Sequence, residues 1–427
     1  MTAVALHSSP LQHGRLWGDD VAASLRDSMF ILGPFPTLSQ TFIYREFDAM
    51  AELGLDVNVL STRPRRPGTT QLSGALREVQ SRALYLEHNS IRVVASMGGQ
   101  LRSPTVRDTM RWMMALPHRT PAKRMRAAAA VLAAAHFAPE LHKRGVRYVH
   151  SHFAGFQTEL AMALSRLLDV PYGCTWHAYG IYQDRNILPE KAAGARVLLT
   201  CTRHNVEHLR RLCPASRDRI HLTQHGLHLR QVPESPPIDD TGTPVILAVG
   251  RMVPTKGFPH LVEAAQLLKA RGLSFELRFL GDGPAKPKLE ALVRALGLKE
   301  QVSFLGARLN GEVFREIAAA RAVVVPSVRA PDGDMDGLPN VVLEAMSMAR
   351  PVVGSRLSGI PEAVIPGKTG FLAEPGNAAD LARHIDVLLK DVALARRLGR
   401  QGWERAQTGF DVRKNIRQVI RHIANVP

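Results

Sequence analysis

The chain of 427 residues contains few cysteines, few aromatic residues and no long apolar run. Its three cysteines, Cys174, Cys201 and Cys213, show no Cys-x-x-Cys spacing, so they form no disulfide framework and favour a reducing, cytoplasmic setting. No stretch approaches the roughly 18 to 20 apolar residues that span a bilayer. The N-terminus also lacks the basic start and apolar run of a signal peptide. The composition, 45% hydrophobic and 22% charged, is that of an ordinary globular protein.

Acidic residues are scarce relative to basic ones, with 38 Asp and Glu against 55 Lys and Arg and a net charge of +17. The excess is concentrated in segment 91–147, where eleven Lys or Arg accompany two acidic residues, a local charge of +9. Such a segment is either a solvated basic surface or a contact with an anionic membrane surface. No zinc finger, helix-turn-helix or aromatic-basic motif accompanies it, so nucleic acid is not expected as a partner. The protein is expected in the cytoplasm, either free or at the inner face of the membrane.

A chain of this length exceeds one typical core and predicts two domains. Segment Ser28–Gly33, the amphipathic helix after it and Leu55–Leu60 form a strand-helix-strand opening, which is typical of a doubly wound α/β domain. The Pro-rich stretch Val232–Pro244 is the clearest linker. We therefore expect a poorly ordered N-terminus over 1–27, a first domain over 28–235, a second domain over 236–404 and a terminal helix over 405–427.

The second domain is the more legible half, because short apolar strands alternate with helical patterns. The expected strands are Val245–Val249, Glu276–Leu280, Val302–Leu305, Ala322–Val325 and Pro351–Val353. The expected helices are Pro259–Arg271, Ala285–Leu296, Glu312–Ala320 and Asn340–Met348. This alternation indicates a parallel sheet covered on both faces, whose strand ends gather ligand groups at one edge. In the first domain, segment 87–143 is helical in character but its boundaries cannot be read.

Segment Ser327–Phe371 organises the second domain. Asp336 and Glu344 lie eight positions apart across a predicted loop-to-helix junction, with Glu344 about two turns inside the helix. Gly337 permits unusual backbone angles, and Pro339 suits the first helical turn. A helix N-terminus beside glycines offers unpaired N–H groups to phosphate or sugar oxygens. The alternative is an ordinary helix whose preceding carboxylate complements the helix dipole.

This segment resembles the signature of the retaining glycosyltransferases of glycosyltransferase family 4. Their pattern E-G-x-x-x-x-x-x-E-A-M/L, then P-V-V and G-x-x-E, is matched here by DGLPNVVLEAM, PVVGS and SGIPEAV. Asp336 replaces the family's first glutamate. The early segment FPTLSQTFIYRE resembles exopolysaccharide and colanic-acid-type members. The resemblance covers almost the whole chain and implies the GT-B fold, an α/β architecture of two Rossmann-like domains. The resemblance further implies that an acceptor-binding domain and a nucleotide-sugar domain face each other across a cleft, and that the last helix packs back on the first domain.

The resemblance also assigns donor-binding residues. The segment GRMVPTKG at 250–257 matches a family turn whose Arg and Lys hold the donor diphosphate, roles implied for Arg251 and Lys256. A guanidinium and an ammonium suit the oxygens of a diphosphate. By the same match, Asp336 contacts the donor sugar and Glu344 binds the ribose hydroxyls. The remaining implied donor contacts are Gly250, Gly281, Arg308, Gly337, Leu338 and Pro339.

In the first domain, the segment TWHAYGI at 175–181 resembles the family pattern t-x-H-x-x-D-i. His177 therefore stands where the family histidine lies beside the transferred sugar, and Gly180 occupies the place of the usual aspartate. With 17 histidines in the chain, an ordinary structural histidine is the alternative for any one of them. The acceptor candidates that the resemblance suggests are Ser39, Gln40, Thr41 and His152.

These observations predict a retaining, metal-independent glycosyltransferase that uses a nucleotide-diphospho-sugar, with UDP the expected nucleotide. The catalytic candidates are His177, Asp336, Arg251 and Lys256, and the acceptor is a saccharide, a lipid-linked saccharide or a small natural product. No cofactor is expected beyond the nucleotide-sugar co-substrate. The acids of DGDMD at 332–336 lack the terminal bidentate acid of a calcium loop, so no metal site is expected. The alternatives are an epimerase or phosphorylase of the same fold, or a catalytically silent nucleotide-binding protein.

Overall fold

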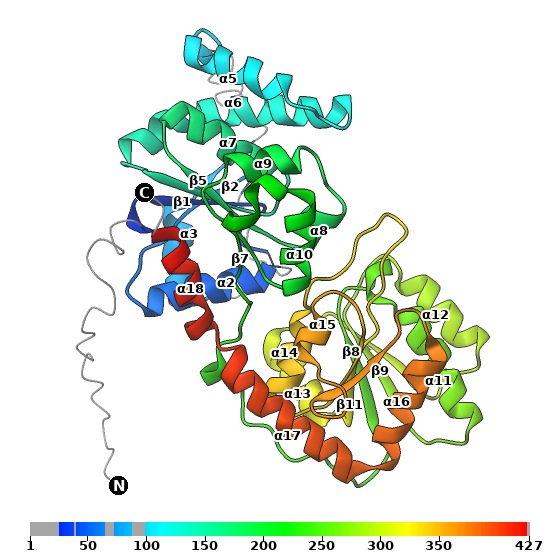
Figure 1. Cartoon of the computed structure of the whole chain (residues 1–427). Coiled ribbons are helices and arrows are strands. Elements are labelled where there is room, and N and C mark those ends of the chain that lie inside the picture. The colour runs from blue at the N-terminus through cyan, green and yellow to red at the C-terminus, as the bar shows by residue number, and fades with distance from the viewer. Residues whose placement is uncertain (1–24, 38–39, 65–71, 88–98, 425–427) are drawn as a thin grey trace, which may run out of the picture.

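Each half of the chain forms a parallel sheet with helices on both faces (Figure 1). The computed structural model describes residues 25–37, 40–64, 72–87 and 99–424. The first sheet has the strand order β3-β2-β1-β4-β5-β6-β7, and the second β10-β9-β8-β11-β12-β13. In both sheets the chain begins centrally, winds to one edge and then crosses to the other. This is the doubly wound α/β arrangement that the sequence predicted, which is thereby confirmed.

The first domain is built on a sheet whose central strands are buried along their whole length, because helices cover both faces. Its strands are β1 (Ser28–Leu32), β2 (Asn58–Ser61), β3 (Leu84–Tyr85), β4 (Tyr148–His152), β5 (Tyr172–Trp176), β6 (Leu198–Thr200) and β7 (Ile220–Leu222). Its helices are α2 (Thr41–Glu52), α3 (Gly74–Arg82), α5 (Pro104–Ala115), α6 (Pro121–Lys143), α7 (Phe156–Leu168), α8 (Ala178–Tyr182), α9 (Leu188–Gly194) and α10 (Arg203–Leu212). The second strand therefore begins three residues later than the sequence indicated.

The second domain follows the sequence prediction closely. Its strands are β8 (Val245–Val249), β9 (Glu276–Leu280), β10 (Val302–Gly306), β11 (Ala322–Val325), β12 (Val352–Ser355) and β13 (Gly370–Ala373). Its helices are α11 (Phe258–Ala270), α12 (Lys286–Ala295), α13 (Asn310–Ala319), α14 (Asn340–Ser347), α15 (Ile360–Ala363), α16 (Ala378–Lys390) and α17 (Val392–Gly409). The predicted strands and helices are present, and the edge strand β13 was not foreseen.

The chain returns to the first domain in its last helix, α18 (Val412–Ala424), which Figure 1 shows in red beside α2. Five apolar side chains of α18 are buried in the core of the first domain: Val412, Ile416, Val419, Ile420 and Ile423. Burial of an apolar side chain of this size contributes about 1.5–3 kcal/mol. This face therefore fastens the end of the chain to the domain in which it began.

The observed limits of the domains differ from those expected at two places. Leu25 is fully buried in the core of the first domain, so this domain begins before residue 28. Ala406 is fully buried in the second domain, and the crossing to α18 lies at 409–412 rather than at 404. Residues 1–24 of the expected N-terminal segment lie outside the described residues.

At this crossing the returning chain pairs with the loop that leads out of the first domain. The Leu227 N–H donates to the carbonyl of Phe410 at 2.8 Å, and the Val412 N–H donates to the carbonyl of Leu227 at 3.1 Å. Gly226 allows this approach, because a Cβ at that position would lie 2.4 Å from the Val412 nitrogen. The two connections between the domains therefore run side by side.

The basic segment 91–147 consists mainly of α5 and α6, which lie at the end of the first domain farthest from the second (Figure 1). Residues 91–98 lie outside the described residues. Helix α6 is joined to α7 and α9 by a buried ionic cluster around Glu159, whose side chain is 0% exposed. Glu159 accepts hydrogen bonds from Arg126 Nε at 2.9 Å, Asn186 Nδ2 at 3.1 Å and Lys191 Nζ at 3.0 Å. Arg126 also pairs with Asp184.

Candidate functional site

The first three strands of the second sheet end in loops that carry the predicted donor residues. Gly250 follows β8 and Gly281 follows β9, and the two loops touch. Gly281 has a φ of +138°, and a Cβ there would lie 2.0 Å from the Gly250 carbonyl oxygen, so only glycine fits. Arg251, which follows Gly250 in the loop after β8, has an exposed side chain. This contact holds the loop after β8 against the sheet edge with its cation accessible.

Lys256 and Asp336 meet at this edge, although 80 positions separate them. Lys256 ends a short 3₁₀ turn (Pro254–Lys256), and its Nζ lies 3.0 Å from both carboxylate oxygens of Asp336. The carboxylate also accepts a 2.7 Å hydrogen bond from the hydroxyl of the buried Ser327, which follows β11. The side chains of Lys256 and Asp336 remain 17% and 20% exposed. An ammonium and a carboxylate are therefore held side by side where solvent can reach both.

Helix α14 begins directly beyond this pair. Pro339 is the N-cap residue in an extended conformation, so it precedes the helix instead of occupying the first turn as predicted. Leu338 is buried, and Gly337 lies against the first domain, where a side chain would begin 3.7 Å from the Cβ of Ala178. Glu344 is the fifth residue of α14, one turn inside it and not two, because the helix rises about 1.5 Å per residue over a 5.4 Å turn.

Glu344 is paired across the domain interface. Its Oε1 accepts a 2.7 Å hydrogen bond from Arg45 of α2, and the two side chains are only 13% and 14% exposed. One turn earlier on both helices, Asn340 Nδ2 donates to the hydroxyl of the predicted acceptor residue Thr41 at 3.4 Å. Two residues spaced i and i+4 on α2 thus face two residues with the same spacing on α14.

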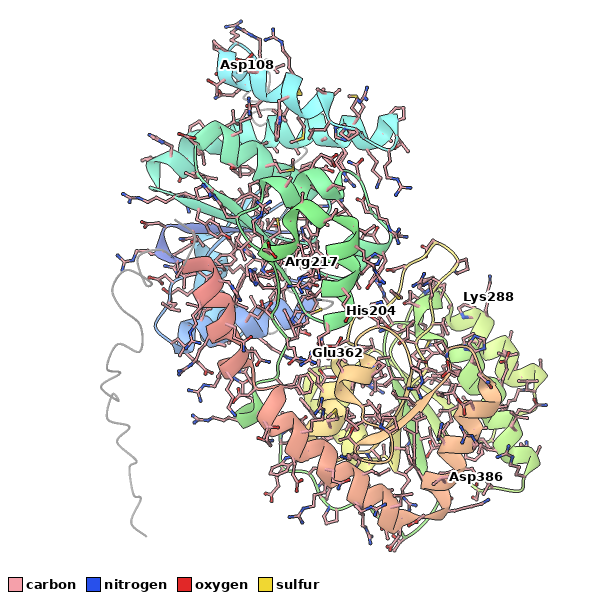
Figure 2. All side chains as sticks on the ribbon, in the orientation of Figure 1. Asp108, His204, Arg217, Lys288, Glu362 and Asp386 are labelled. Carbon is pink, nitrogen blue, oxygen red and sulfur yellow. The ribbon has the colours of Figure 1, made fainter. Side chains whose placement is uncertain are left out.

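A second contact between the domains involves a helix terminus. Glu362 of α15 accepts hydrogen bonds from the N–H groups of Arg203 at 3.0 Å and His204 at 3.1 Å, the first two residues of α10. Figure 2 shows Glu362 and His204 facing each other across the interface. A carboxylate placed here satisfies unpaired N–H groups and complements the helix dipole. A third contact joins Gln183 to Asp332 at 2.6 Å.

The predicted histidines form a buried cluster on the first-domain side. His177 follows β5, its Nε2 lies 3.3 Å from Nδ1 of His152, and its ring stacks on that of His225 at 5.2 Å. Burial and the neighbouring histidines hold the pKa of His177 well below its usual value, and burial lowers the pKa of His152 to about 3. Both rings are therefore neutral at physiological pH.

His225, in contrast to His177 and His152, favours its protonated, charged form. Burial alone lowers its pKa, but the sulfur of Cys201 and the carboxylate of Glu46, at 3.1 Å from Nδ1, raise it to about 10. The ligand atoms of His177, Cys201 and His225 all lie within 4.8 Å of one another, a spacing that a metal ion could close. The sequence analysis expected no metal site, and this cluster went unnoticed because its members follow three different strands.

Other predicted residues lie at the margin of this arrangement. Arg308 follows β10, its side chain is 47% exposed and its guanidinium lies 4.0 Å from Glu312. Gln40 is the N-cap residue of α2, and the acceptor candidate Ser39 lies outside the described residues. The position of the usual family aspartate is sterically closed, since a Cβ on Gly180 would lie 2.7 Å from the Ala154 nitrogen.

Known proteins similar to this chain are described as glycosyltransferases. The sequence profile of the family described as Glycosyl transferases group 1 matches residues 243–391. This match covers most of the second domain. The putative colanic acid biosynthesis glycosyltransferase WcaL of Escherichia coli K12 is 35% identical over 40% of this chain and 42% of its own length. Alpha-D-kanosaminyltransferase of Streptomyces kanamyceticus is 31% identical over 45% of this chain and 48% of its own. The chain thus spans less than half the length of these curated relatives.

Solved structures extend the comparison to the fold of the whole chain. A sucrose-phosphate synthase from Thermosynechococcus elongatus superposes with a TM-score of 0.70 at 21% identity, over 92% of this chain and 96% of its own. Anabaena HepE in complex with UDP superposes with a TM-score of 0.67 at 16% identity, over 92% of this chain and 98% of its own. The glycosyltransferase group 1 domain is therefore the second half of a GT-B fold, as the resemblance implied.

The main elements that sequence reasoning missed are charged residues at the domain interface. Arg45 and Glu46 lie in the segment FIYRE, where a polar pair within an apolar helix could have been noticed. Glu362 is the acid of SGIPEAV, but nothing in the sequence tells that it caps a helix of the other domain. Cys201 carries no motif of its own.

Proposed function

We propose that the protein is a retaining glycosyltransferase that transfers a sugar from a nucleotide-diphospho-sugar, with UDP as the nucleotide, to a hydroxyl group. The observation that carries this proposal is the pair formed by Lys256 and Asp336 at the N-terminus of α14. A cation suited to a diphosphate and a carboxylate suited to sugar hydroxyls stand side by side there. No other pair in the described part of the second domain is both at the strand ends and adjacent to this helix terminus.

In the proposed reaction, the diphosphate lies between the loop after β8 and the N-terminus of α14. Arg251, Lys256 and the free N–H groups of the helix stabilise the negative charge that develops as the diphosphate leaves, without a metal cofactor. Asp336 and the neutral His177 contact the sugar, and Glu344 accepts hydrogen bonds from the ribose. The acceptor hydroxyl attacks from the face that the diphosphate leaves, so the configuration at the anomeric carbon is retained.

The Lys256–Asp336 and Arg45–Glu344 ion pairs must change when the donor binds. Both proposed donor-binding carboxylates already have a cationic partner, and donor binding must share or replace these partners. Since one of the two pairs joins the domains, the domain interface responds to the donor. Glu344 keeps its second oxygen for the ribose, because a carboxylate accepts more than one hydrogen bond.

A saccharide, lipid-linked saccharide or natural-product acceptor is supported by the relatives' names, which include colanic acid biosynthesis and kanosaminyl transfer. UDP is supported by the similarity to HepE, whose structure contains it. A cytoplasmic protein that binds the inner membrane face would place α5 and α6 against anionic lipid, since Arg107, Arg111 and Arg124 are exposed on these helices, as is Met125. In the described part of the chain, no helix is long and apolar enough to cross a bilayer.

The test is a thermal-shift screen with UDP, GDP, ADP and dTDP, followed by transfer assays with the matching sugars. A ligand at about 100 times its dissociation constant adds roughly 2.7 kcal/mol, a shift of a few degrees for domains of this size. Stabilisation by UDP, and a product whose anomeric configuration equals that of the donor by NMR, are the expected results. Inversion would contradict the proposed mechanism, and nucleotide binding without turnover would favour a silent nucleotide-binding protein, to which the Asp336 and Gly180 departures point. Flotation with anionic and neutral vesicles tests the membrane contact.

A further inference from the structure

The strongest unexplained feature is the cluster of His177, Cys201 and His225. The three residues follow β5, β6 and β7, neighbouring strands whose carboxyl ends meet at the same edge of the first sheet. All three side chains are more than nine-tenths buried, and one nitrogen or sulfur atom of each lies within 4.8 Å of those of the other two. The cluster thus contains two imidazoles and one thiol, and 24 positions separate each of these residues from the next in the sequence.

The hydrogen bonds around the cluster leave ligand atoms available. Glu46 Oε1 holds Nδ1 of His225 at 3.1 Å, so Nε2 is the remaining ring nitrogen, and the ring also interacts with the thiol of Cys201. His177 bonds His152 through Nε2, whereas its buried Nδ1 has no hydrogen-bond partner among the described residues. An orphaned buried nitrogen costs about 1–3 kcal/mol, which a ligand at that atom would recover.

The Glu46–His225 contact also has the form of an outer-shell interaction at a metal site. Metal-binding histidines usually donate their second ring N–H to a carboxylate, which fixes the ring and raises its basicity. Glu46 comes from α2 and is itself only 7% exposed, so the carboxylate is fixed by packing. The site therefore includes both ligands and support.

The ligand types select a class of cation. Thiolate and imidazole suit zinc and related soft or borderline ions, whereas magnesium and calcium prefer oxygen ligands. Zinc binds nitrogen at about 2.0–2.1 Å and sulfur at about 2.3 Å, so tetrahedral ligand atoms stand roughly 3.5 Å apart. Side-chain rotations that move the ligand atoms by about 1 Å would bring them from the present 4.8 Å spacing to this distance. Three protein ligands would leave a fourth position for water or an incoming group.

We propose that His177, Cys201 and His225 form a binding site for a zinc-class cation, with Glu46 as the positioning residue that holds His225. Because the ligands bind as thiolate and neutral imidazoles, their protons pass to solvent as the cation enters. The thiol of Cys201 borders the donor loop, since a side chain on Gly337 would begin 3.6 Å from Sγ. Occupation of the site removes His177 from the sugar, so the cation inhibits transfer. That consequence rests on the proposed function, while binding itself does not.

The experiment uses the full chain, freed of metal by a chelator and titrated with Co²⁺, which occupies zinc sites and absorbs light when bound to thiolate. We expect one equivalent to produce a thiolate-to-cobalt absorption band that added Zn²⁺ abolishes. The band is lost in Cys201→Ser, and Co²⁺ binds about tenfold to hundredfold more weakly in Glu46→Gln, the usual effect of an outer-shell change. The matched control is Cys213→Ser, which removes another buried cysteine, at the C-terminal end of α10 and outside the cluster, and keeps the band.

Several outcomes overturn the site. These are no thiolate band at saturating Co²⁺, an unchanged band in Cys201→Ser, or loss of the band in the Cys213→Ser control. Should Cys201→Ser fail to fold, as judged by circular dichroism, His225→Gln gives the same test through a second ligand. The proposed function fails separately: wild type without any transfer contradicts it and leaves the cobalt result standing. Transfer that saturating Zn²⁺ does not inhibit contradicts the inhibitory role.

Discussion

Two substitutions in the ionic cluster around Glu159 should destabilise the protein to different extents. The difference follows from the number of charged partners that each remaining residue keeps. Among the described residues, Glu159 is the only carboxylate that Lys191 contacts; Glu159→Gln removes this charge, and the Lys191 side chain is 0% exposed. The ammonium would then keep only uncharged acceptors, the carbonyl of Ala154 at 2.7 Å and the amide oxygen of the substituted side chain. Leaving a buried charge without its counter-charge costs about 3–5 kcal/mol.

The reverse substitution, Lys191→Met, has a smaller expected cost. Glu159 would keep Arg126 and Asn186, so its charge remains compensated. The loss is then close to one hydrogen bond to a charged group, about 1.5–3 kcal/mol, and the buried Met side chain offsets part of it. We therefore expect Glu159→Gln to be clearly more destabilising than Lys191→Met, although both break the same contact.

Urea unfolding followed by the fluorescence of Trp176, which is fully buried in the first domain, measures both effects. With a slope of about 2–3 kcal/mol per molar, the midpoint should fall by roughly 1–2 M for Glu159→Gln. Asp108→Asn is the control, because its ion pair with Arg111 is 61% and 76% exposed and contributes little. Equal losses for the two buried variants, or a loss for Glu159→Gln no larger than that of the control, would refute the reasoning.

Three further predictions concern the donor site and the pH dependence of stability. Lys256→Ala and Arg251→Ala should each lower kcat by about 10²–10³, the usual loss for one group that stabilises developing charge, with unchanged circular dichroism; wild-type rates in both would exclude diphosphate binding. Asp336→Glu should retain measurable transfer and Asp336→Asn should lose most of it, which single-turnover rates will show. Burial lowers the pKa of His150 to about 3 from an unfolded value of 6.5, so stability should fall as pH drops below 6.5, because the unfolded state alone binds the proton. His150→Gln should reduce that slope by up to about 1.4 kcal/mol per pH unit in urea titrations at several pH values, and an unchanged slope would contradict it.

The second domain could be predicted from the sequence because its signals are local. Val245–Val249 and Ala322–Val325 are short apolar runs between turn residues, and their limits agree with β8 and β11. The contact between Lys256 and Asp336 was not itself predicted, but both residues follow strands of one parallel sheet, where topology brings loops together.

The first domain gave weaker signals for physical reasons. Helix α6 is rich in alanine on all sides, so it has no marked apolar stripe, and it continues through Pro139, which ordinarily ends a helix. The Arg45–Glu344 pair joins residues 299 positions apart, and the cap that Glu362 places on α10 spans 159 positions. Contacts of this kind depend on how two finished domains meet, which no local pattern records.

The paired connections at Leu227 and Val412 have a consequence for motion. Two domains joined by one flexible segment can twist and slide relative to each other. Here two connecting segments run side by side and are joined by backbone hydrogen bonds. The two domains therefore rotate about this pair of connections as about a hinge, and they separate most at the side of the interface farthest from it. Under the proposed function, substrate entry depends on this rotation, and the interface contacts of Arg45 and Glu362 set how often the two domains separate.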